Sequence, residues 1–204
     1  MKLTFLAIIF ALFLIPCLAQ TDKSDLVLTG EIINFNKKEL SLRYRLKNRS
    51  NEVIYISINP KQVNGEPGYY LTLDNTDNSL LRISSRVYQV SNWTHPNPYK
   101  MGVELKILKP SETYDERVFI KIPSRESSIY DGSVPRNKRI ITSKKIKKVE
   151  LEIGYFIEDE GILNFLERKP FGWFIQGEET ISKGKNKDKS FLEIQNLATF
   201  NISI

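Results

Sequence analysis

The segment ELSLRYRLKN, residues 39–48, alternates apolar and polar side chains along most of its length. Its apolar positions are Leu40, Leu42, Tyr44 and Leu46. Its intervening polar positions are Ser41, Arg43, Arg45 and Lys47. Successive side chains of a β-strand point to opposite faces of a sheet, so this period of two predicts a strand with one buried side and one solvent-facing side.

Segments with a similar pattern follow one another along most of the chain. They are DLVLTGEIINF (25–35), EVIYISI (52–58), GYYLTLD (68–74), LLRISSRVYQV (80–90), GVELKIL (102–108), YDERVFIKIP (114–123), KIKKVELEIGYFIE (145–158), FLEIQ (191–195) and ATFNISI (198–204). We expect the first to bulge near Gly30, and segments 68–74 and 80–90 to form a hairpin. About eight to ten strands at spacings of about ten residues indicate an all-β, antiparallel β-sandwich.

One segment has helical spacing instead. In DEGILNFLER, residues 159–168, apolar side chains recur three to four positions apart, and Lys169-Pro170 follows. Asp159 is a residue type that caps helix starts, and the residue before a proline disfavours helical geometry. The pattern therefore predicts one short helix near 159–168.

The first 19 residues have the pattern of a signal peptide. Lys2 precedes an apolar run from Leu3 to Ile15, which is shorter than the about 20 residues that span a membrane. Pro16 ends the run, and small residues precede a cut between Ala19 and Gln20. We therefore expect residues 20–204 to form a single exported β-sandwich domain, periplasmic or secreted, without a transmembrane segment.

Cys17, the only cysteine, allows a second interpretation of this leader. Leu14-Ile15-Pro16-Cys17 resembles a lipobox, in which the cysteine is acylated and becomes the first residue. Pro16 stands where a lipobox has a small residue, so we favour ordinary cleavage and keep lipid anchoring as the alternative. Ordinary cleavage leaves a chain without cysteine, which its core alone must stabilise.

The net charge of +6 is concentrated in two basic runs. The first run carries no acid, and its cations are Arg136, Lys138, Arg139, Lys144, Lys145, Lys147 and Lys148. The second is KGKNKDK, residues 183–189. Such runs can contact anionic surfaces, but we favour the simpler interpretation of a solvated loop and a charged strand edge. We expect no nucleic-acid partner, because an exported protein meets little nucleic acid.

The sequence contains no recognisable catalytic or metal-binding set. His95 is the only histidine, and we interpret it as an exposed loop residue rather than as a catalytic base. One histidine without a cysteine in the mature chain is too few residues for a structural zinc site. Ser182 and Lys185 match Ser-x-x-Lys inside a lysine-rich stretch, where the lysine would stay hydrated and charged. DNTDNS, residues 74–79, lacks the glycine and the glutamate of an EF-hand loop and is typical of an Asx-rich turn. We therefore predict no catalytic residue, no metal and no cofactor.

Aromatic residues at 91–100 allow two interpretations, a binding loop or packing of Trp93 against one end of the sandwich. Trp93, His95 and Tyr99 lie there among prolines and asparagines. Exposed Trp and Tyr side chains are favoured where proteins bind sugars or protein partners. The loop is a candidate contact for an unknown protein or polysaccharide.

The layout of the first half resembles a known group of folds. YRLKNRSNEVIYI (44–56), then a hairpin, then LKPSETYDERVFIKIP (108–123) is similar to immunoglobulin-like sandwiches of exported bacterial proteins. It is similar also to small bacterial proteinase-inhibitor sandwiches. The resemblance implies an immunoglobulin-like fold over about residues 25–123, and it rests on turn motifs rather than on site chemistry.

Three functional hypotheses follow. The first is an exported non-enzymatic protein with a binding or envelope-structural role. The second is a proteinase-inhibitor-like module that acts through an exposed loop. The third, least favoured, is a hydrolase that uses two carboxylates.

Overall fold

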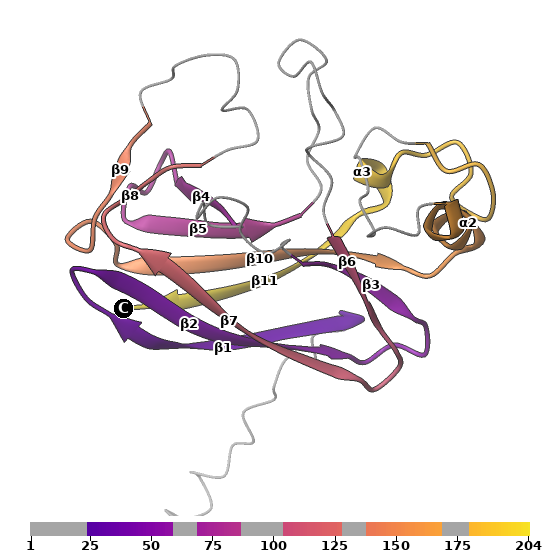
Figure 1. Ribbon diagram of the computed structural model, residues 1–204, viewed down its shortest axis with the longest axis horizontal. Coiled ribbons are helices and arrows are strands. Elements are labelled where there is room, and N and C mark those ends of the chain that lie inside the picture. Colours follow the sequence, from indigo (N-terminus) through magenta and orange to yellow (C-terminus); the bar gives the residue numbers. More distant parts are fainter. Residues whose placement is uncertain (1–23, 59–68, 87–103, 128–137, 169–179) are drawn as a thin grey trace, which may run out of the picture.

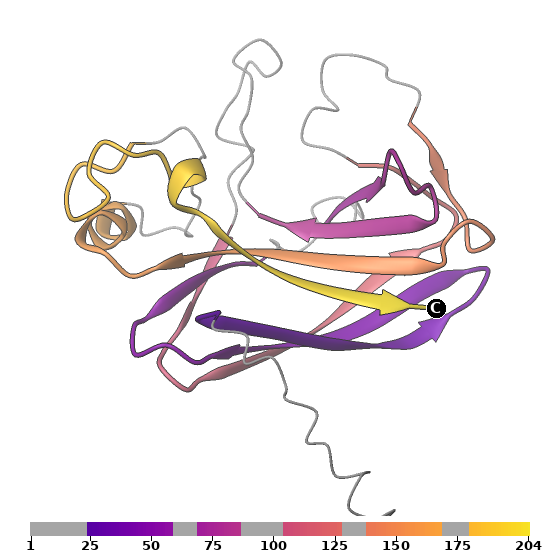
Figure 2. The same cartoon turned by 180° about the vertical axis from the view of Figure 1, so that it is seen from behind.

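A computed structural model describes residues 24–58, 69–86, 104–127, 138–168 and 180–204. The leader, with Cys17 and the expected cut between Ala19 and Gln20, lies outside these residues. In the described part the chain is an all-β sandwich of two main sheets with helices at one end (Figures 1 and 2). No described helix has both the length and the apolar character needed to cross a membrane.

The smaller sheet contains three antiparallel strands in the order β1-β2-β7. Their bounds are Leu26–Phe35 for β1, Glu39–Asn48 for β2 and Thr113–Lys121 for β7. The segment ELSLRYRLKN is β2, the central strand of this sheet, and its four apolar side chains are at most 2% exposed. The buried and exposed faces predicted for β2 are confirmed, apart from Ser41, which is buried as well.

The larger sheet contains six strands in the order β4-β5-β10-β3-β6, with β11 also paired to β10. Their bounds are Ile54–Ile58 for β3, Tyr70–Leu73 for β4, Leu80–Ser85 for β5, Glu104–Leu108 for β6, Lys148–Ile157 for β10 and Asn196–Ser203 for β11. The predicted β4–β5 hairpin is confirmed. The pairing of β5 with β10 is parallel, unlike the other ladders among the described strands.

The main core lies between the two sheets and contains mostly leucine and isoleucine. A second apolar cluster lies on the outer side of the larger sheet, where Phe156 and Tyr55 meet the helices. Those helices are α2, Glu160–Arg168, and α3, Phe191–Ile194. Phe191 packs edge-on against both Phe156 and Phe165, at ring-centroid distances of 5.6 and 5.0 Å. The helix predicted near residues 159–168 is confirmed as α2.

Two local predictions were wrong, and one pair of short strands was missed. FLEIQ is mostly helix α3 rather than a strand, because Ser190 and Glu193 form a reciprocal capping box at its start. The irregularity in β1 lies between Ile32 and Asn34, whereas Gly30 pairs regularly with Tyr44. A two-residue pair, β8 (Ser124–Arg125) with β9 (Ile140–Ile141), was not predicted and brings the described strands to eleven.

Candidate functional site

The outer face of the three-stranded sheet carries an open hollow of about 270 Å³. We call it the arginine hollow, and its lining residues are Thr29, Gly30, Glu31, Arg43, Tyr44, Arg45 and Asp115. Strand register assembles it: Arg43 lies opposite Glu31 on β1, and Arg45 lies opposite Asp115 on β7. Both arginines occupy outward positions of β2, which is why they face solvent rather than the core.

One carboxylate holds the two guanidinium groups of the hollow together. Asp115 Oδ1 accepts a hydrogen bond from Arg45 Nε at 3.0 Å and lies 3.6 Å from Arg43 Nη2. The arginine side chains are 50% and 57% exposed and that of Asp115 is 37% exposed. Since each guanidinium has five N–H groups, donors remain that can bind an anion from solution.

Exposed apolar side chains lie further along β7 and β1 on the same outward face. Phe119 on β7 is 56% exposed and Ile33 on β1 is 44% exposed. The Arg117 guanidinium lies 5.8 Å from the centre of the Phe119 ring, within cation–π range. The face therefore combines cations with an exposed aromatic ring.

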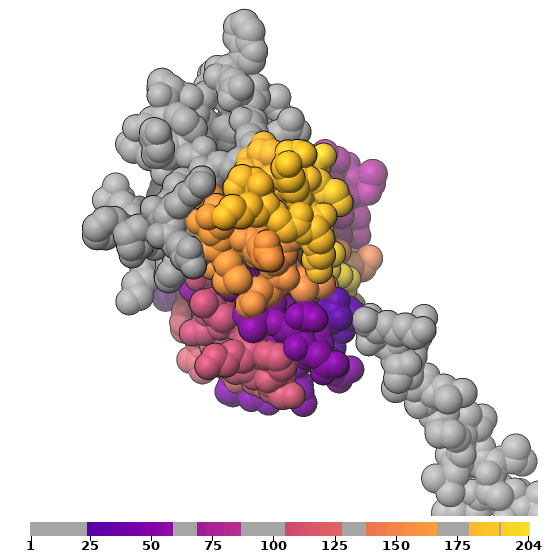
Figure 3. Space-filling view, turned by 90° about the vertical axis from the view of Figure 1, so that its right-hand side faces the viewer, coloured from indigo at the N-terminus to yellow at the C-terminus, as the bar shows by residue number. Residues whose placement is uncertain are grey.

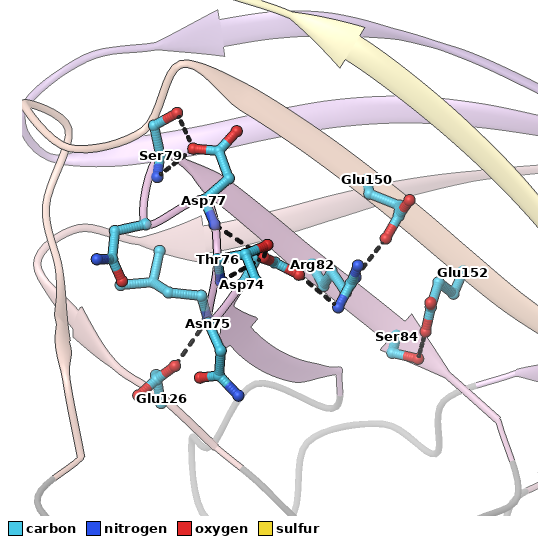
Figure 4. Close-up of polar contacts among 12 residues, drawn as sticks. Asp74, Asn75, Thr76, Asp77, Ser79, Arg82, Ser84, Glu126, Glu150 and Glu152 are labelled. Atoms are coloured by element: carbon cyan, nitrogen blue, oxygen red, sulfur yellow. Dashed lines mark hydrogen bonds and ion pairs between the residues drawn. The ribbon is translucent and has the colours of Figure 1, made fainter.

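The outer face of the larger sheet carries a second charged group, which we call the charge ladder. Its members are Asp74, Arg82, Ser84, Arg86, Glu150 and Glu152 (Figure 4 labels all but Arg86). Arg82 bridges Asp74, at 2.9 Å, and Glu150 across neighbouring strands. Glu152 accepts a hydrogen bond from the Ser84 hydroxyl at 2.8 Å. These three acidic side chains are only 13–17% exposed, so the ladder's carboxylates are mostly enclosed by their own partners.

Arg139, which the sequence placed in a candidate anion-binding run, is instead part of an internal network. Its guanidinium donates to both carboxylate oxygens of Glu126, at 2.7 and 3.0 Å, and to the carbonyl oxygens of Leu73 and Asp74. Burial alone would raise the pKa of Glu126, but the hydrogen bonds from Arg139 and from the Leu73 amide outweigh it and lower that pKa. Arg139 thus ties β9 to the turn after β4.

The turn DNTDNS uses its carboxylates on its own backbone. Asp74 Oδ1 accepts hydrogen bonds from the Thr76 hydroxyl and from the amides of Thr76 and Asp77. These bonds, the Thr76 hydroxyl first, hold the pKa of Asp74 well below its usual range. Ser79 does the same for Asp77, whose pKa is also lowered. The segment is an Asx-rich turn, as its sequence indicates.

A tyrosine cluster joins the two sheets inside the sandwich. The Tyr44 hydroxyl donates to Glu116 on β7 and lies 3.2 Å from the hydroxyl of Tyr69, which precedes β4. Tyr114 donates to the same Glu116 oxygen at 2.9 Å. Burial raises the pKa of Tyr44 and of Tyr69, and the nearby Glu116 carboxylate adds to the effect. Both phenols therefore stay neutral at physiological pH and serve as hydrogen-bonding groups rather than as nucleophiles.

The other predicted site residues fall into two groups. Trp93, His95 and Tyr99, with Arg136, lie outside the described residues. Lys138, Lys144, Lys145 and Lys147 are exposed, while Lys148 pairs with Asp77 at 3.2 Å. The Lys147 carbonyl accepts a hydrogen bond from the Ile204 amide, so this run lies at the end of the sandwich that also holds the C-terminus. The structure thus separates the predicted anion-binding run into solvent-facing lysines and internally paired residues.

Sequence reasoning missed the arginine hollow. Its signal was visible as the outward cations of ELSLRYRLKN, but Asp115 is about 70 residues away, and its position opposite Arg45 follows only from strand register. The charge ladder was missed for the same reason. Two acidic residues, Glu31 and Asp115, line the hollow. Among the described residues, no group of histidine, cysteine and acidic side chains is suited to hold a metal ion.

Comparison with known protein families, curated proteins and solved structures finds no match to this chain.

Proposed function

We propose that this chain is an exported, non-enzymatic β-sandwich protein that binds an acidic polysaccharide on the outer face of its three-stranded sheet. The observation that carries the proposal is the arginine hollow, where Asp115 holds Arg43 and Arg45 side by side on an exposed face. The immunoglobulin-like character of the sandwich and its export through the N-terminal leader belong to the same proposal.

The chemistry of the hollow suits the acidic groups of a sugar polymer. A guanidinium presents parallel N–H donors that match a carboxylate or a sulfate in a two-point contact. The volume of about 270 Å³ lies below the about 300–1,000 Å³ of typical small-molecule pockets, so one acidic group of a longer chain fits best. Phe119 offers an exposed ring along the same strand for stacking against a sugar.

The acid pair in the hollow supports binding better than hydrolysis. A carboxylate-dependent hydrolase needs one carboxyl group that stays protonated, which burial in an apolar site normally provides. Glu31 and Asp115 are both exposed, and Asp115 lies between two arginines. The same polymers nevertheless allow a direct check, because cleavage would release new reducing ends.

The test measures binding of polygalacturonate, heparin and neutral dextran by isothermal titration calorimetry at low salt. We expect binding of the acidic polymers only, and a loss of about tenfold or more in affinity for the double variant Arg43→Gln/Arg45→Gln. The matched control is Lys144→Gln/Lys145→Gln, which removes the same charge elsewhere. An equal loss of affinity in both double variants would show that binding depends only on net charge, and it would contradict a site in the hollow.

Two further measurements use the same polymers. Phe119→Ala should weaken binding without changing its salt dependence, since it removes an uncharged contact. The release of reducing ends would instead favour the hydrolase hypothesis.

Mass spectrometry of the protein from an exporting host tests the leader: an N-terminal Gln20 supports ordinary cleavage, and an acylated Cys17 contradicts it.

A further inference from the structure

Residues 182–189, which we call the lysine loop, form a closed and hydrogen-bonded loop. The Ile181 amide donates to the Lys189 carbonyl at 2.9 Å, and the Asp188 amide donates back to Ile181 at 2.9 Å. Ile181 itself is 2% exposed and packs in the outer apolar cluster with α2 and α3. The loop is therefore anchored at its base, unlike a freely solvated linker.

Asp159 fastens the loop to the start of α2. This carboxylate is 7% exposed. One oxygen accepts a hydrogen bond from the Gly161 amide at 2.6 Å, and the other accepts from the Asn186 amide and side chain at 3.1 and 3.2 Å. Gly184 has a φ of 81°, and a Cβ there would lie 2.9 Å from both Asp159 oxygens. The close approach and the left-handed backbone both require glycine at this position.

The loop carries four exposed lysines: Lys183, Lys185, Lys187 and Lys189. No ion pair links them to an acid of the described residues. Lys189 lies near Glu193, whose pKa is lowered first by hydrogen bonds from Ser190 and slightly by this lysine. Like charges so close in one closed loop repel each other, and the buried clamp holds them together against that repulsion.

An exposed apolar side chain lies on α2, one position before a residue that contacts the loop. Leu163 on α2 is 39% exposed, and its neighbour Asn164 donates to the Ser182 hydroxyl at 3.4 Å. Figure 3 faces the end of the molecule where α2 and α3 lie, with the chain after residue 180 against the helix region. Basic groups next to an exposed leucine are the combination by which proteins contact lipid bilayers at their surface.

We propose that the lysine loop, held by Asp159 and flanked by Leu163, is a contact site for an anionic lipid bilayer. Lysine ammonium groups are compact charges on long stems, which suits a diffuse layer of phosphate headgroups. A two-point carboxylate contact calls instead for the guanidinium pair of the arginine hollow. The lysine loop lies next to α2 and α3, whereas the arginine hollow lies on the three-stranded sheet, so the lipid contact does not depend on the proposed polysaccharide site.

The test is cosedimentation of the full protein, as purified from an exporting host, with vesicles of equal parts phosphatidylglycerol and phosphatidylcholine. We expect binding that falls steeply with salt, and none to pure phosphatidylcholine vesicles. The triple variant Lys183→Gln/Lys185→Gln/Lys187→Gln should lose about tenfold or more in vesicle affinity. The matched control, Lys144→Gln/Lys145→Gln/Lys147→Gln, removes the same charge at the opposite end and should retain most of the binding.

Two single variants test the clamp and the apolar contact. Asp159→Asn keeps all four lysines but weakens the clamp, so vesicle binding should fall while circular dichroism stays unchanged. Leu163→Ser should lower binding most at high salt, where charge attraction is screened. Both variants leave the arginine hollow intact, so polygalacturonate binding measured in parallel separates this proposal from the proposed function.

Several outcomes would overturn the proposal. Equal losses in the two triple variants would show that only net charge matters. Heparin binding that depends on the loop lysines, without vesicle binding, would assign the loop to an acidic polysaccharide. Full vesicle binding by Asp159→Asn, with the loop shown to be disordered by hydrogen exchange, would remove the role of the clamp.

Discussion

The outer faces of the two sheets use the same charged residue types in opposite ways. On the larger sheet, Glu150 and Glu152 are 17% and 15% exposed and are bonded to partners on the neighbouring strand β5 and just beyond it. On the smaller sheet, Arg43 and Arg45 are at least half exposed and share one exposed aspartate. The first arrangement satisfies its own charges, whereas the second leaves hydrogen-bond donors facing solvent.

We expect the two sets of charged residues to differ in role: the charge ladder in stability and the arginine hollow in the proposed binding. An enclosed carboxylate that lost its arginine would retain a large desolvation penalty, so the charge ladder should contribute to stability. Exposed ion pairs contribute little, because water and salt screen them. The comparison therefore predicts that substitutions on the larger sheet change stability, whereas those on the smaller sheet change binding.

The largest expected effect concerns the tyrosine cluster that joins the two sheets. Tyr44 and Tyr69 have raised pKa values in the folded protein, so they keep protons that the unfolded chain releases above about pH 10. Stability is then fully present below pH 10 and falls as the pH rises, by about 1.4 kcal/mol per pH unit for each such tyrosine. The free energy of unfolding measured in urea should therefore be about 3 kcal/mol lower at pH 11 than at pH 8 because of these two tyrosines.

The control for this pH effect is Tyr69→Phe. It removes one of the two titrating phenols, so its free energy of unfolding should fall less steeply between pH 10 and pH 11 than that of the parent. Identical slopes would show that the alkaline loss comes from other groups and that the cluster does not link the sheets energetically.

The next effect tests the internal network of Arg139. Arg139→Ala removes both hydrogen bonds to Glu126 and those to the turn after β4, so we expect a loss of about 2 kcal/mol in the free energy of unfolding. Lys145→Ala, an exposed cation of the same sequence run, should change stability by less than about 0.5 kcal/mol. Chemical denaturation measures both, and equal effects would contradict the distinction drawn between these residues.

The smallest effect is expected in the arginine hollow. Arg45→Ala breaks an exposed ion pair with Asp115 and should cost less than about 1 kcal/mol of stability. Arg82→Ala, the corresponding change in the charge ladder, leaves two mostly enclosed carboxylates unpaired and should cost more. Thermal unfolding of the two variants side by side tests the order, and a reversed order would contradict the contrast between the faces.

Much of the sandwich could be predicted from the sequence because most of its strands alternate apolar and polar residues over part of their length. ELSLRYRLKN is the clearest example: its period of two specifies which side chains enter the core, whichever strands lie beside it. FLEIQ failed because five residues are too few to separate a period of two from one of 3.6. There the local capping signal, Ser190 followed three residues later by Glu193, carried the correct information.

The candidate sites were harder to predict because strand register creates them. Asp115 reaches Arg45 only because β7 pairs with β2 in one register, and nothing near either residue encodes that partnership. Arg139 shows the converse. Its neighbours in sequence are exposed lysines, and only the carbonyl groups of the turn after β4 distinguish it from them.

Strand β10 has a consequence for the order in which the chain can fold. It pairs with β3, β5 and β11, so the strands of the larger sheet cannot be joined until residues 148–157 have been synthesised. Strands β3 and β5 precede it by more than 60 residues, and such long-range pairing is slow to form. Most of the polypeptide would thus leave the ribosome before its larger sheet can assemble. Such a delay is compatible with the proposed export, which requires an unfolded chain.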